Sequence, residues 1–294
     1  MEVTESSVLV LPFTAASVGV ARRNLVSDLI EAGIRGSVVT DTALVISELF
    51  SNALQHGTPL PGQAIRAAWD LDGDTVRVAV SDGGGSTLPE LGQPTSTATG
   101  GRGLRIVARL SRRWGTSSGY EGTTVWAEVQ LGPVAAVAAE SGLTDWVRTR
   151  SGNSQLVHNA AAWLPDARHG RVRLVELNVS SRFHDDHTIV TICGEIDLYT
   201  APRLHSELAG LLAEGMPPRV VIDMSGVEFC DSTGMNVLLS CLRRARERGG
   251  ELEIAAPKPA VRKILQVTGL DSVFTLIEDT DPRGLSRPKP AVPQ

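Results

Sequence analysis

Two glycine-rich segments in the first half of the chain have residue types suited to holding a nucleotide. The first, from Asp82 to Gly85, contains three glycines in succession, which would let a flat ring approach the backbone closely. The Asp82 carboxylate offers an acceptor for the exocyclic amino group of adenine. The second runs from Thr99 to Leu104 and opens a predicted helix, where backbone N–H groups form an anion site suited to phosphates. A lone glycine cluster is weak evidence, because ordinary loops often contain one.

Three polar residues share one edge of a predicted helix at residues 37–56. Glu48, Asn52 and His56 are spaced four apart, so a carboxylate, an amide and an imidazole lie above one another. The neighbouring apolar face carries Val45, Leu49 and Ala53. A solvated polar edge is the alternative explanation, and this helix alone does not exclude it. His56 could simply pack or cap the helix end.

Ser232 is predicted to lie where a strand ends and a helix begins. An apolar, β-branched run at residues 219–223 precedes it, and apolar residues at helical spacing follow it. Asp231 and Ser232 can cap the first helical turn, which is the simplest explanation of the pair. We also expect Ser232 to present an exposed hydroxyl at the positive end of a helix, where a phosphate would be tolerated and would change the surface charge.

The remaining sequence pattern predicts the elements that position these residues. Further strands are expected at 8–13, 64–69, 75–81, 122–129, 172–179, 188–193, 251–256 and 273–277. The strands at 172–179 and 188–193 form a predicted hairpin around His184-Asp-Asp-His187. Two His and two Asp there could bind a metal, but a tight polar turn explains them better.

Composition indicates a globular protein and excludes some functions. Of 294 residues, 42% are hydrophobic and 21% charged, and the net charge of −5 argues against direct DNA binding. The three cysteines are unclustered in apolar runs and are expected to be small buried hydrophobes. No apolar run is long enough for a membrane span, and the first residues lack signal-peptide features. We therefore expect a cytoplasmic location and no membrane partner.

A weakly patterned stretch separates two predicted domains. The domains are expected at residues 1–132 and 172–280, joined by a linker at 133–171 and followed by a disordered, proline-containing tail at 281–294. A flexible coil of that length spans on the order of 35 Å. Ser232 could therefore reach a site in the first domain of its own chain or of a neighbour.

The second half resembles the STAS domain of anti-sigma factor antagonists. Gly-Glu-Ile-Asp at 194–197 and the run from Val221 to Gly234, which contains Asp-Ser-Thr-Gly, carry a resemblance that covers about residues 172–278. It implies an α/β domain. In that family a partner kinase phosphorylates the serine directly after the aspartate, which is Ser232 here.

The first half resembles the Bergerat ATP-binding fold of the GHKL superfamily, and in particular the anti-sigma factor serine kinases. The ordered motifs are Glu-x-x-x-Asn on a helix, strand-Asp-x-Gly, Gly-x-Gly opening a helix, and Gly-Thr at a strand, over residues 8–131. The resemblance implies an α/β (α+β) sandwich whose mixed sheet has helices on one face. It also suggests a homodimer through this domain. Histidine kinases share the fold, but they need a phosphoacceptor His on a helix before it, which the printed sequence does not offer.

The resemblance implies a role for each motif residue. Glu48 would orient or deprotonate the attacking hydroxyl, and Asn52 would bind Mg²⁺. Asp82 would bind adenine, and Gly84 would allow its close approach. The rest of the ATP site would consist of the phosphate-binding Gly101 and Gly103 and the adenine-pocket Thr123.

Together the two halves predict a partner-switching regulator of an alternative sigma factor. The first half would be an ATP-dependent protein serine kinase and anti-sigma factor, and its substrate would be Ser232 or the equivalent serine of a separate STAS antagonist. The alternative is a non-catalytic nucleotide-binding interaction module that its own STAS domain regulates. A STAS signalling scaffold whose linker receives the input is a third hypothesis.

Overall fold

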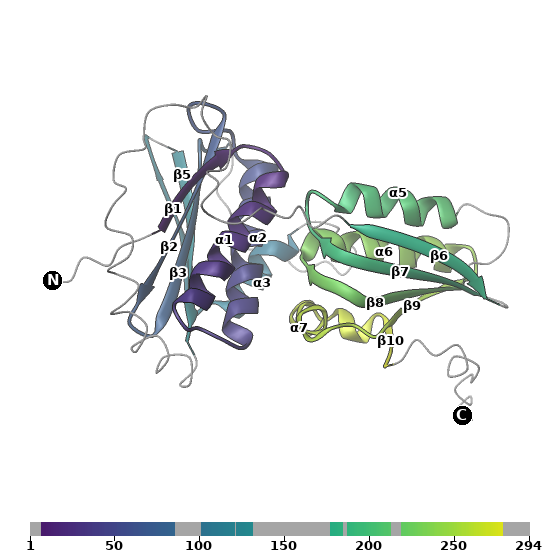
Figure 1. Cartoon of the computed structure of the whole chain (residues 1–294). Helices are drawn as coiled ribbons and strands as arrows, with labels where there is room; N and C mark the ends of the chain where they lie inside the picture. The colour runs from purple at the N-terminus through teal and green to yellow at the C-terminus, as the bar shows by residue number, and fades with distance from the viewer. Residues whose placement is uncertain are drawn as a thin grey trace, which may run out of the picture. The chain divides into compact units, whose positions relative to one another are not determined.

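The computed structural model of the chain describes residues 7–85, 101–120, 122–131, 177–184, 187–212 and 219–278. Its contacts divide into two compact units, Met1–Leu174 and Val175–Gln294. Each unit has its own five-stranded sheet and its own buried apolar core (Figure 1).

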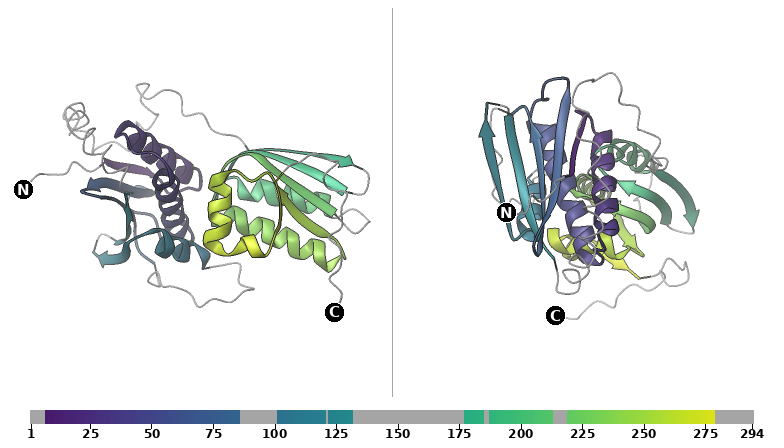
Figure 2. Two further views of the ribbon diagram at one scale, coloured as in Figure 1. Left: turned by 90° about the horizontal axis from the view of Figure 1, so that it is seen from below. Right: turned by 60° about the vertical axis from the view of Figure 1, so that its left-hand side comes forward.

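The first unit combines one sheet with three described helices. In chain order its elements are β1 (Ser7–Pro12), α1 (Ala16–Glu31), α2 (Ser37–His56), β2 (Ala64–Asp72), β3 (Thr75–Asp82), α3 (Arg102–Leu110), β4 (Arg113–Gly119) and β5 (Gly122–Gln130). The helices lie on one face of the sheet (Figures 1 and 2), as expected. The α/β class is confirmed.

The sheet of the first unit has the order β1-β2-β3-β5-β4, and every described pairing in it is antiparallel. The expected mixed sheet is therefore wrong for this unit. The physical reason is that β2–β3 and β4–β5 are hairpins with short turns, which can join only antiparallel strands. The sequence pattern also missed β4, because its run Arg-Trp-Gly-Thr-Ser-Ser-Gly has little apolar alternation.

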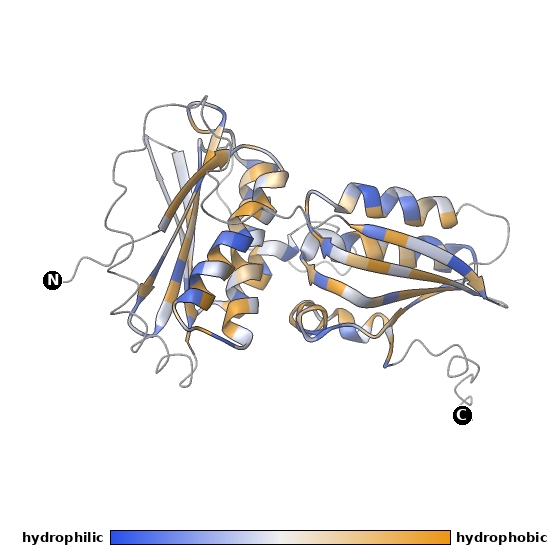
Figure 3. Ribbon diagram, viewed as in Figure 1, coloured by the Kyte–Doolittle hydropathy of each residue, from blue (hydrophilic) through white to orange (hydrophobic). Residues whose placement is uncertain are grey.

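The core of this unit forms where the sheet meets α2. On β3, Val76, Val78 and Val80 alternate toward the helices and are at most 1% exposed. The predicted apolar face of α2 is confirmed, since Val45, Leu49 and Ala53 are also at most 1% exposed. Apolar and polar residues also alternate around the helices and along the strands when the chain is coloured by hydropathy (Figure 3).

The second unit is a mixed α/β layer structure. Its elements are β6 (Asn178–His184), β7 (His187–Ile196), α5 (Ala201–Leu211), β8 (Arg219–Cys230), α6 (Ser232–Glu247), β9 (Glu251–Ala255), α7 (Pro259–Thr268), the short 3₁₀ helix η1 (Leu270–Ser272) and β10 (Thr275–Ile277). The sheet order is β10-β9-β8-β7-β6, with parallel pairing from β7 to β10 and β6 antiparallel to β7. The helices are the crossover connections that parallel strands require.

The first hairpin of the second unit has its turn and its second strand where the pattern predicted them, but its first strand lies later in the chain. The strand expected at 172–179 mostly falls outside the described residues, and β6 instead runs from Asn178 to His184. His184 pairs with His187 across the hairpin, and their rings stack with centroids 5.5 Å apart. Among the described residues, no group of three or more His, Cys, Asp or Glu side chains could hold a metal ion.

The cysteines differ in their surroundings. Cys230 and Cys241 are buried, as expected, but Cys193 is exposed, so its prediction as a buried hydrophobe was wrong. Cys193 lies on the strand face opposite Ile192, which is fully buried, and the period of two in a strand explains the difference. Burial raises the pKa of Cys241 to about 11, against the opposing effect of Arg244.

Within the described part of the chain, none of the helices has the length and apolar character needed to cross a membrane.

Candidate functional site

The carboxylate of Asp82 lies where β3 ends, next to β5. Asp82 pairs with Thr123 in the sheet, and its side chain is 4% exposed. The Gly84 N–H donates to Asp82 Oδ1 at 2.6 Å. Gly84 has φ of +87°, which favours glycine, and a Cβ there would lie 3.6 Å from Thr123 Oγ1. The structure therefore brings Asp82, Gly84 and Thr123 together.

Burial sets the protonation behaviour of this carboxyl group. Loss of solvation raises the pKa of Asp82, and the hydrogen bond from the Gly84 amide lowers it in part. A buried carboxylate with one remaining acceptor oxygen can bind an amino group that replaces the lost water.

The segment that directly follows the predicted helix at residues 37–56 holds the glycine loop in place. The Thr58 N–H and hydroxyl both donate to the Gly84 carbonyl, at 2.8 and 2.7 Å, and the Gly83 N–H donates to the Thr58 carbonyl at 2.7 Å. A Cβ at Gly57 would lie 2.6 Å from Asp82 Cγ, so glycine is needed at that position for steric reasons. Sequence reasoning missed this contact because the two segments are separated by a whole hairpin.

The second glycine cluster lies against Glu48. Gly101 is the N-cap of α3, with φ of +83°. A Cβ on Gly103 would lie 2.6 Å from Glu48 Oε2, so the carboxylate fits against the first turn of α3 only because position 103 has no side chain. Glu48 is 2% exposed, whereas Asn52 is half-buried.

Helix α2 connects the two ends of the candidate site. Glu48 lies at the α3 end, and the carbonyl of exposed His56 lies next to Gly85 at the Asp82 end. Eight residues of helix separate them by about 12 Å. A nucleoside triphosphate can bridge such a separation, with its base at Asp82 and its phosphates at α3. Asn52 lies midway on the same edge of the helix.

A buried arginine also reaches this helix. Arg22 of α1 is 2% exposed, and its Nη1 donates to Ser47 Oγ at 3.2 Å. The guanidinium thus lies beside the residue that precedes Glu48. Sequence reasoning had not singled out Arg22, which directly follows the fully buried Ala21.

The described residues fit a magnesium nucleotide rather than a metal site made by the protein alone. The Asn52 amide oxygen and the Glu48 carboxylate are hard donors of the kind that Mg²⁺ prefers. Because the described chain has no cluster of three or more His, Cys, Asp or Glu side chains, Mg²⁺ here would need nucleotide phosphate oxygens as further ligands. The Glu48 carboxylate itself occupies the space that a Cβ on Gly103 would need.

In the second unit, Ser232 is the first residue of α6. Asp231 is the N-cap, and its Oδ1 accepts from the N–H groups of Thr233 and Gly234 at 2.8 and 3.1 Å. The predicted cap is confirmed for Asp231. Ser232 is only 7% exposed, so the expected exposed hydroxyl is wrong. The end of β7 packs here, and the Asp231 N–H donates to the Ile196 carbonyl at 3.1 Å.

The loop after β7 lies beside this helix start. Asp197 Oδ1 accepts from the N–H groups of Tyr199 and Thr200 at 3.0 and 3.2 Å, and the Thr200 hydroxyl donates to the Glu195 carbonyl at 2.9 Å. These bonds fix the loop, and they leave the Tyr199 side chain 58% exposed. Sequence reasoning had not singled out Tyr199.

The two units match two different families. Residues 11–129 match the histidine kinase-like ATPase domain, and residues 178–281 match the STAS domain. The chain thus carries a histidine kinase-like ATPase domain, which implies ATP binding, followed by a STAS domain. This pair of domains fits regulation by partner switching.

Known relatives of the STAS part are anti-sigma factor antagonists. The anti-sigma-B factor antagonist of Staphylococcus epidermidis is 28% identical over 107 residues, which is 36% of this chain and 98% of the relative. That of Bacillus subtilis is 28% identical over 35% of this chain and 92% of its own length. The crystal structure of an anti-sigma factor antagonist from Mycobacterium paratuberculosis is 33% identical over 36% of this chain and 89% of that chain, with a TM-score of 0.34.

A further solved structure is similar to part of this chain. The crystal structure of the RsbU and RsbW domains of a Mycobacterium tuberculosis protein is 27% identical over 44% of this chain and 33% of that chain, with a TM-score of 0.35.

Proposed function

We propose that the chain is a partner-switching regulator in which residues 1–132 act as an ATP-dependent protein serine kinase and anti-sigma factor. Its substrate is Ser232 of the STAS domain at residues 172–280, or the equivalent serine of a separate antagonist. The observation that carries this proposal is the buried Glu48 carboxylate against the glycine start of α3, in a chain that also holds an Asp-Ser helix start. Residues 133–171 are the linker, and residues 281–294 are a tail.

The proposed reaction is a phosphoryl transfer to a hydroxyl oxygen. ATP supplies the γ-phosphoryl group. The Ser232 oxygen forms a bond to the γ-phosphorus, the bond from that phosphorus to the β–γ bridging oxygen breaks, and ADP leaves. Glu48 orients the hydroxyl and accepts its proton. Asn52 holds Mg²⁺, Asp82 with Gly84 and Thr123 holds adenine, and the N–H groups near Gly101 and Gly103 bind phosphates.

Phosphorylation would change the surface of the STAS domain. It adds about −1.5 to −2 charges beside Asp231, whose Oδ1 already occupies two N–H groups of the helix start. The added charge is unfavourable at a protein contact that fits the neutral serine. The modified domain would leave the kinase, which would then bind and silence an alternative sigma factor in the cytoplasm.

The open face of the first sheet supports a homodimer through the ATP domain. Cross-strand partners place an apolar row across all five strands: Val8, Ala68, Ala79, Trp126 and Gly115. Val8 is 53% exposed, and the Arg77 guanidinium lies 5.2 Å from the Trp126 ring centroid. Val8 is exposed and the other four residues are half-buried, so this row is partly accessible to a second copy of the domain. Analytical ultracentrifugation of wild-type protein and a Val8→Glu variant tests it, and a monomeric wild type would exclude the dimer.

Labelled ATP tests the kinase. Wild-type protein, incubated with Mg²⁺ and γ-labelled ATP, should incorporate label that maps to Ser232, and Ser232→Ala should remove it. A separate STAS antagonist should be labelled in trans by both proteins. An unlabelled wild type, with an unlabelled antagonist, would overturn the proposed activity.

The low exposure of Ser232 supports a second candidate, a nucleotide-binding interaction module without catalysis. Because Ser232 as a whole is 7% exposed, modification of its hydroxyl would require the first turn of α6 or the loop after β7 to open. In this alternative, nucleotide binding only shapes the surface that exchanges partners. Glu48→Ala distinguishes the two: partner release that persists unchanged in this variant supports the module, and loss of release supports the kinase.

A further inference from the structure

The first sheet carries a row of alternating charges on the face that points away from its helices. The row follows directly paired positions on four neighbouring strands, which are Asp70 on β2, Arg77 on β3, Glu128 on β5 and Arg113 on β4. Val76 and Val78, the neighbours of Arg77 along β3, are fully buried toward the helices, so Arg77 lies on the opposite face. We call these four residues the charge row.

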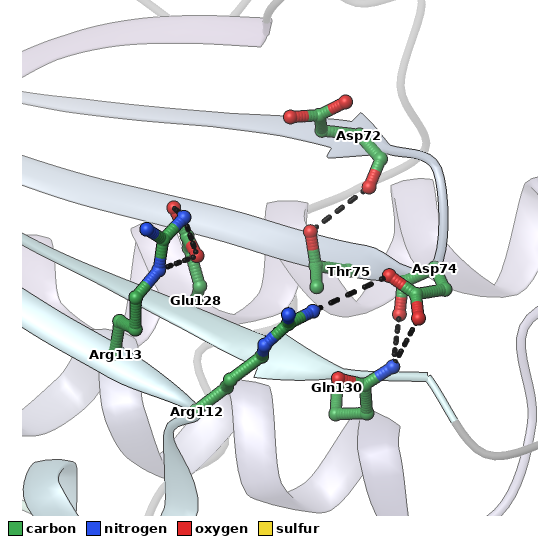
Figure 4. Close-up of polar contacts among 7 residues, drawn as sticks. All are labelled: Asp72, Asp74, Thr75, Arg112, Arg113, Glu128 and Gln130. Carbon is green, nitrogen blue, oxygen red and sulfur yellow. Dashed lines mark hydrogen bonds and ion pairs between the residues drawn. The ribbon is translucent and has the colours of Figure 1, made fainter.

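The two ends of the charge row are not neutralised equally within the chain. Arg113 donates through Nε and Nη2 to the Glu128 carboxylate at 2.9 and 3.2 Å (Figure 4), and its side chain is still 68% exposed. At the other end, burial raises the pKa of Asp70, and the Arg77 guanidinium opposes this effect only in part. The carboxylates of Asp72 and Glu128 add to the rise. A further cation beside Asp70 would therefore stabilise its ionised form.

The apolar row lies beside the charge row on the same face and joins one large side chain to small ones. Its members on the same four strands are Ala68, Ala79, Trp126 and Gly115. A Cβ on Gly115 would lie 2.9 Å from Trp126 Cζ2, so the indole extends from β5 over β4. Along this row the ring therefore raises the surface over β5 and β4, whereas β2 and β3 carry only methyl groups.

One two-fold axis makes the charge row complementary to a second copy of itself. The axis runs parallel to the strands, midway between β3 and β5, so it exchanges β3 with β5 and β2 with β4 between the copies. Asp70 then lies opposite the partner subunit's Arg113. Arg77 likewise lies opposite the partner subunit's Glu128. An axis centred on β3 would instead place Arg77 opposite its own copy, and an axis along the charge row would do so for every charge.

The same axis also fits the apolar row. It brings Trp126 opposite the partner subunit's Ala79. It brings Gly115, which the ring covers, opposite the partner subunit's Ala68. The large ring of one copy thus meets the small residues of the other, as close packing between two sheets requires. Val8, on β1, lies at the edge of the interface in this arrangement.

We propose that the first unit pairs with a second copy of itself through this face, about the two-fold axis between β3 and β5, and that the charge row selects this arrangement. The inference rests on the homodimer of the proposed function and identifies how its two copies are aligned. Sheets that pack face to face commonly keep their strand directions within about 30° of each other, which this axis satisfies. Other alignments bring like charges together, so the charge row disfavours them. Glu48 and the first turn of α3 lie in the helix layer, so the catalytic end of both candidate ATP sites stays outside the interface (Figure 1).

A charge exchange between two variants of the full chain tests the axis. Asp70→Arg places two arginines opposite each other, and Arg113→Glu places two carboxylates opposite each other, at two symmetric positions in each dimer. Analytical ultracentrifugation at low salt should show the dimer Kd of either variant raised roughly 10- to 100-fold over the wild type. An equimolar mixture should form a heterodimer with a Kd near that of the wild type, because opposite charges meet again at both positions.

Three controls address effects within one chain. Arg105→Glu makes the same charge change at an exposed residue of α3, in the helix layer, and should leave Kd unchanged. Thermal unfolding of each variant shows whether it still folds. Asp70→Asn and Arg113→Gln avoid like charges within the chain and should each raise Kd several-fold.

The outcomes that overturn the arrangement are distinct. Unchanged Kd in both reversals, or a mixture that associates no better than its components, excludes it. An equal effect of Arg105→Glu also excludes it, since the change would then follow from net charge alone. If a reversal does not fold, unchanged Kd in Asp70→Asn and Arg113→Gln decides against the charge row.

The same samples separate this inference from the proposed kinase, because sedimentation needs no phosphoryl transfer. If the heterodimer forms as expected and no label reaches Ser232 or a separate antagonist, the kinase proposal fails and the interface stands. If label transfer is normal but the wild type is monomeric, the interface fails and the kinase stands. A wild-type dimer that is insensitive to both reversals retains the homodimer but excludes this axis.

Discussion

Substituting Gly103 by alanine tests the placement of Glu48 more directly than removing the carboxylate does. The new Cβ would lie 2.6 Å from Glu48 Oε2, and ordinary contact begins at 3.4 Å. Either the carboxylate or the start of α3 must therefore move by about 0.8 Å, from that difference. Misplacement of a catalytic group by about 1 Å can cost about 100-fold in rate. We expect phosphoryl transfer to Ser232 to fall by about two orders of magnitude.

The stability of Gly103→Ala should change far less than its activity. Alanine is favoured over glycine inside a helix by about 0.5–1 kcal/mol. That gain opposes the cost of moving a buried carboxylate, so we expect the free energy of unfolding to change by less than about 1 kcal/mol. Denaturant unfolding, measured beside single-turnover transfer of labelled phosphate, separates the two effects.

A matched control is available in the second unit. Gly210 also lies within a helix, α5, and nothing lies within 4 Å of a Cβ built on it. Gly210→Ala should stabilise its unit by about 0.5–1 kcal/mol and leave the transfer rate unchanged. A Gly103→Ala protein that melts like wild type and transfers phosphate at the wild-type rate would refute the role assigned to the Glu48 carboxylate.

Three further substitutions test the remaining contacts. Burial raises the pKa of Asp82 above 3.8, so protonation of this carboxyl group stabilises the folded wild type below that pH, and the stabilisation is lost as the pH rises through the raised pKa. Asp82→Asn should remove this contribution and should also weaken ATP binding. Melting curves from about pH 3 to about pH 7 test the first effect, and nucleotide titration tests the second. An Asp82→Asn variant whose stability changes with pH by the same amount as that of the wild type would contradict it. Asp231→Ala removes the acceptor of two N–H groups and should lower the free energy of unfolding, measured with denaturant, by about 1–2 kcal/mol. An unchanged free energy of unfolding would show that the cap contributes nothing. Gly226→Ala would press a Cβ against Cys193 Sγ and place it 2.9 Å from the Ile192 carbonyl oxygen, so we expect a loss of about 1–3 kcal/mol in the free energy of unfolding. A variant that melts like the wild type would show that β7 and β8 adjust to the added Cβ.

The helix that carries the candidate site was predictable because its signals are local. The apolar residues of α2 repeat at helical spacing, and the stop after His56 is a glycine followed closely by a proline. The same holds for the Asp231 cap, which acts on N–H groups two and three residues away. Helix geometry alone relates such residues, so their positions follow from spacing.

Other features could not be predicted, because they depend on packing between distant segments. Strand β4 has seven residues with little apolar alternation, and its pairing with β5 is what makes it a strand. The burial of Ser232 depends on the fit of the β7 end against α6, where a Cβ on Gly234 would lie 2.5 Å from Ile196 Cγ2. A residue at a helix start is exposed or covered according to such neighbours.

The amino-acid sequence by itself determined which chemical groups are present and which of them share a helix edge or a turn. It placed Glu48 and Asn52 on one side of a helix, Asp82 before glycines, and Ser232 after its capping aspartate. Only the tertiary structure decided that Glu48 lies against Gly103 and that Thr58 holds the Asp82 loop. The physical reason is that backbone geometry fixes relations over a few residues, whereas the close packing of side chains fixes relations between segments far apart in the chain.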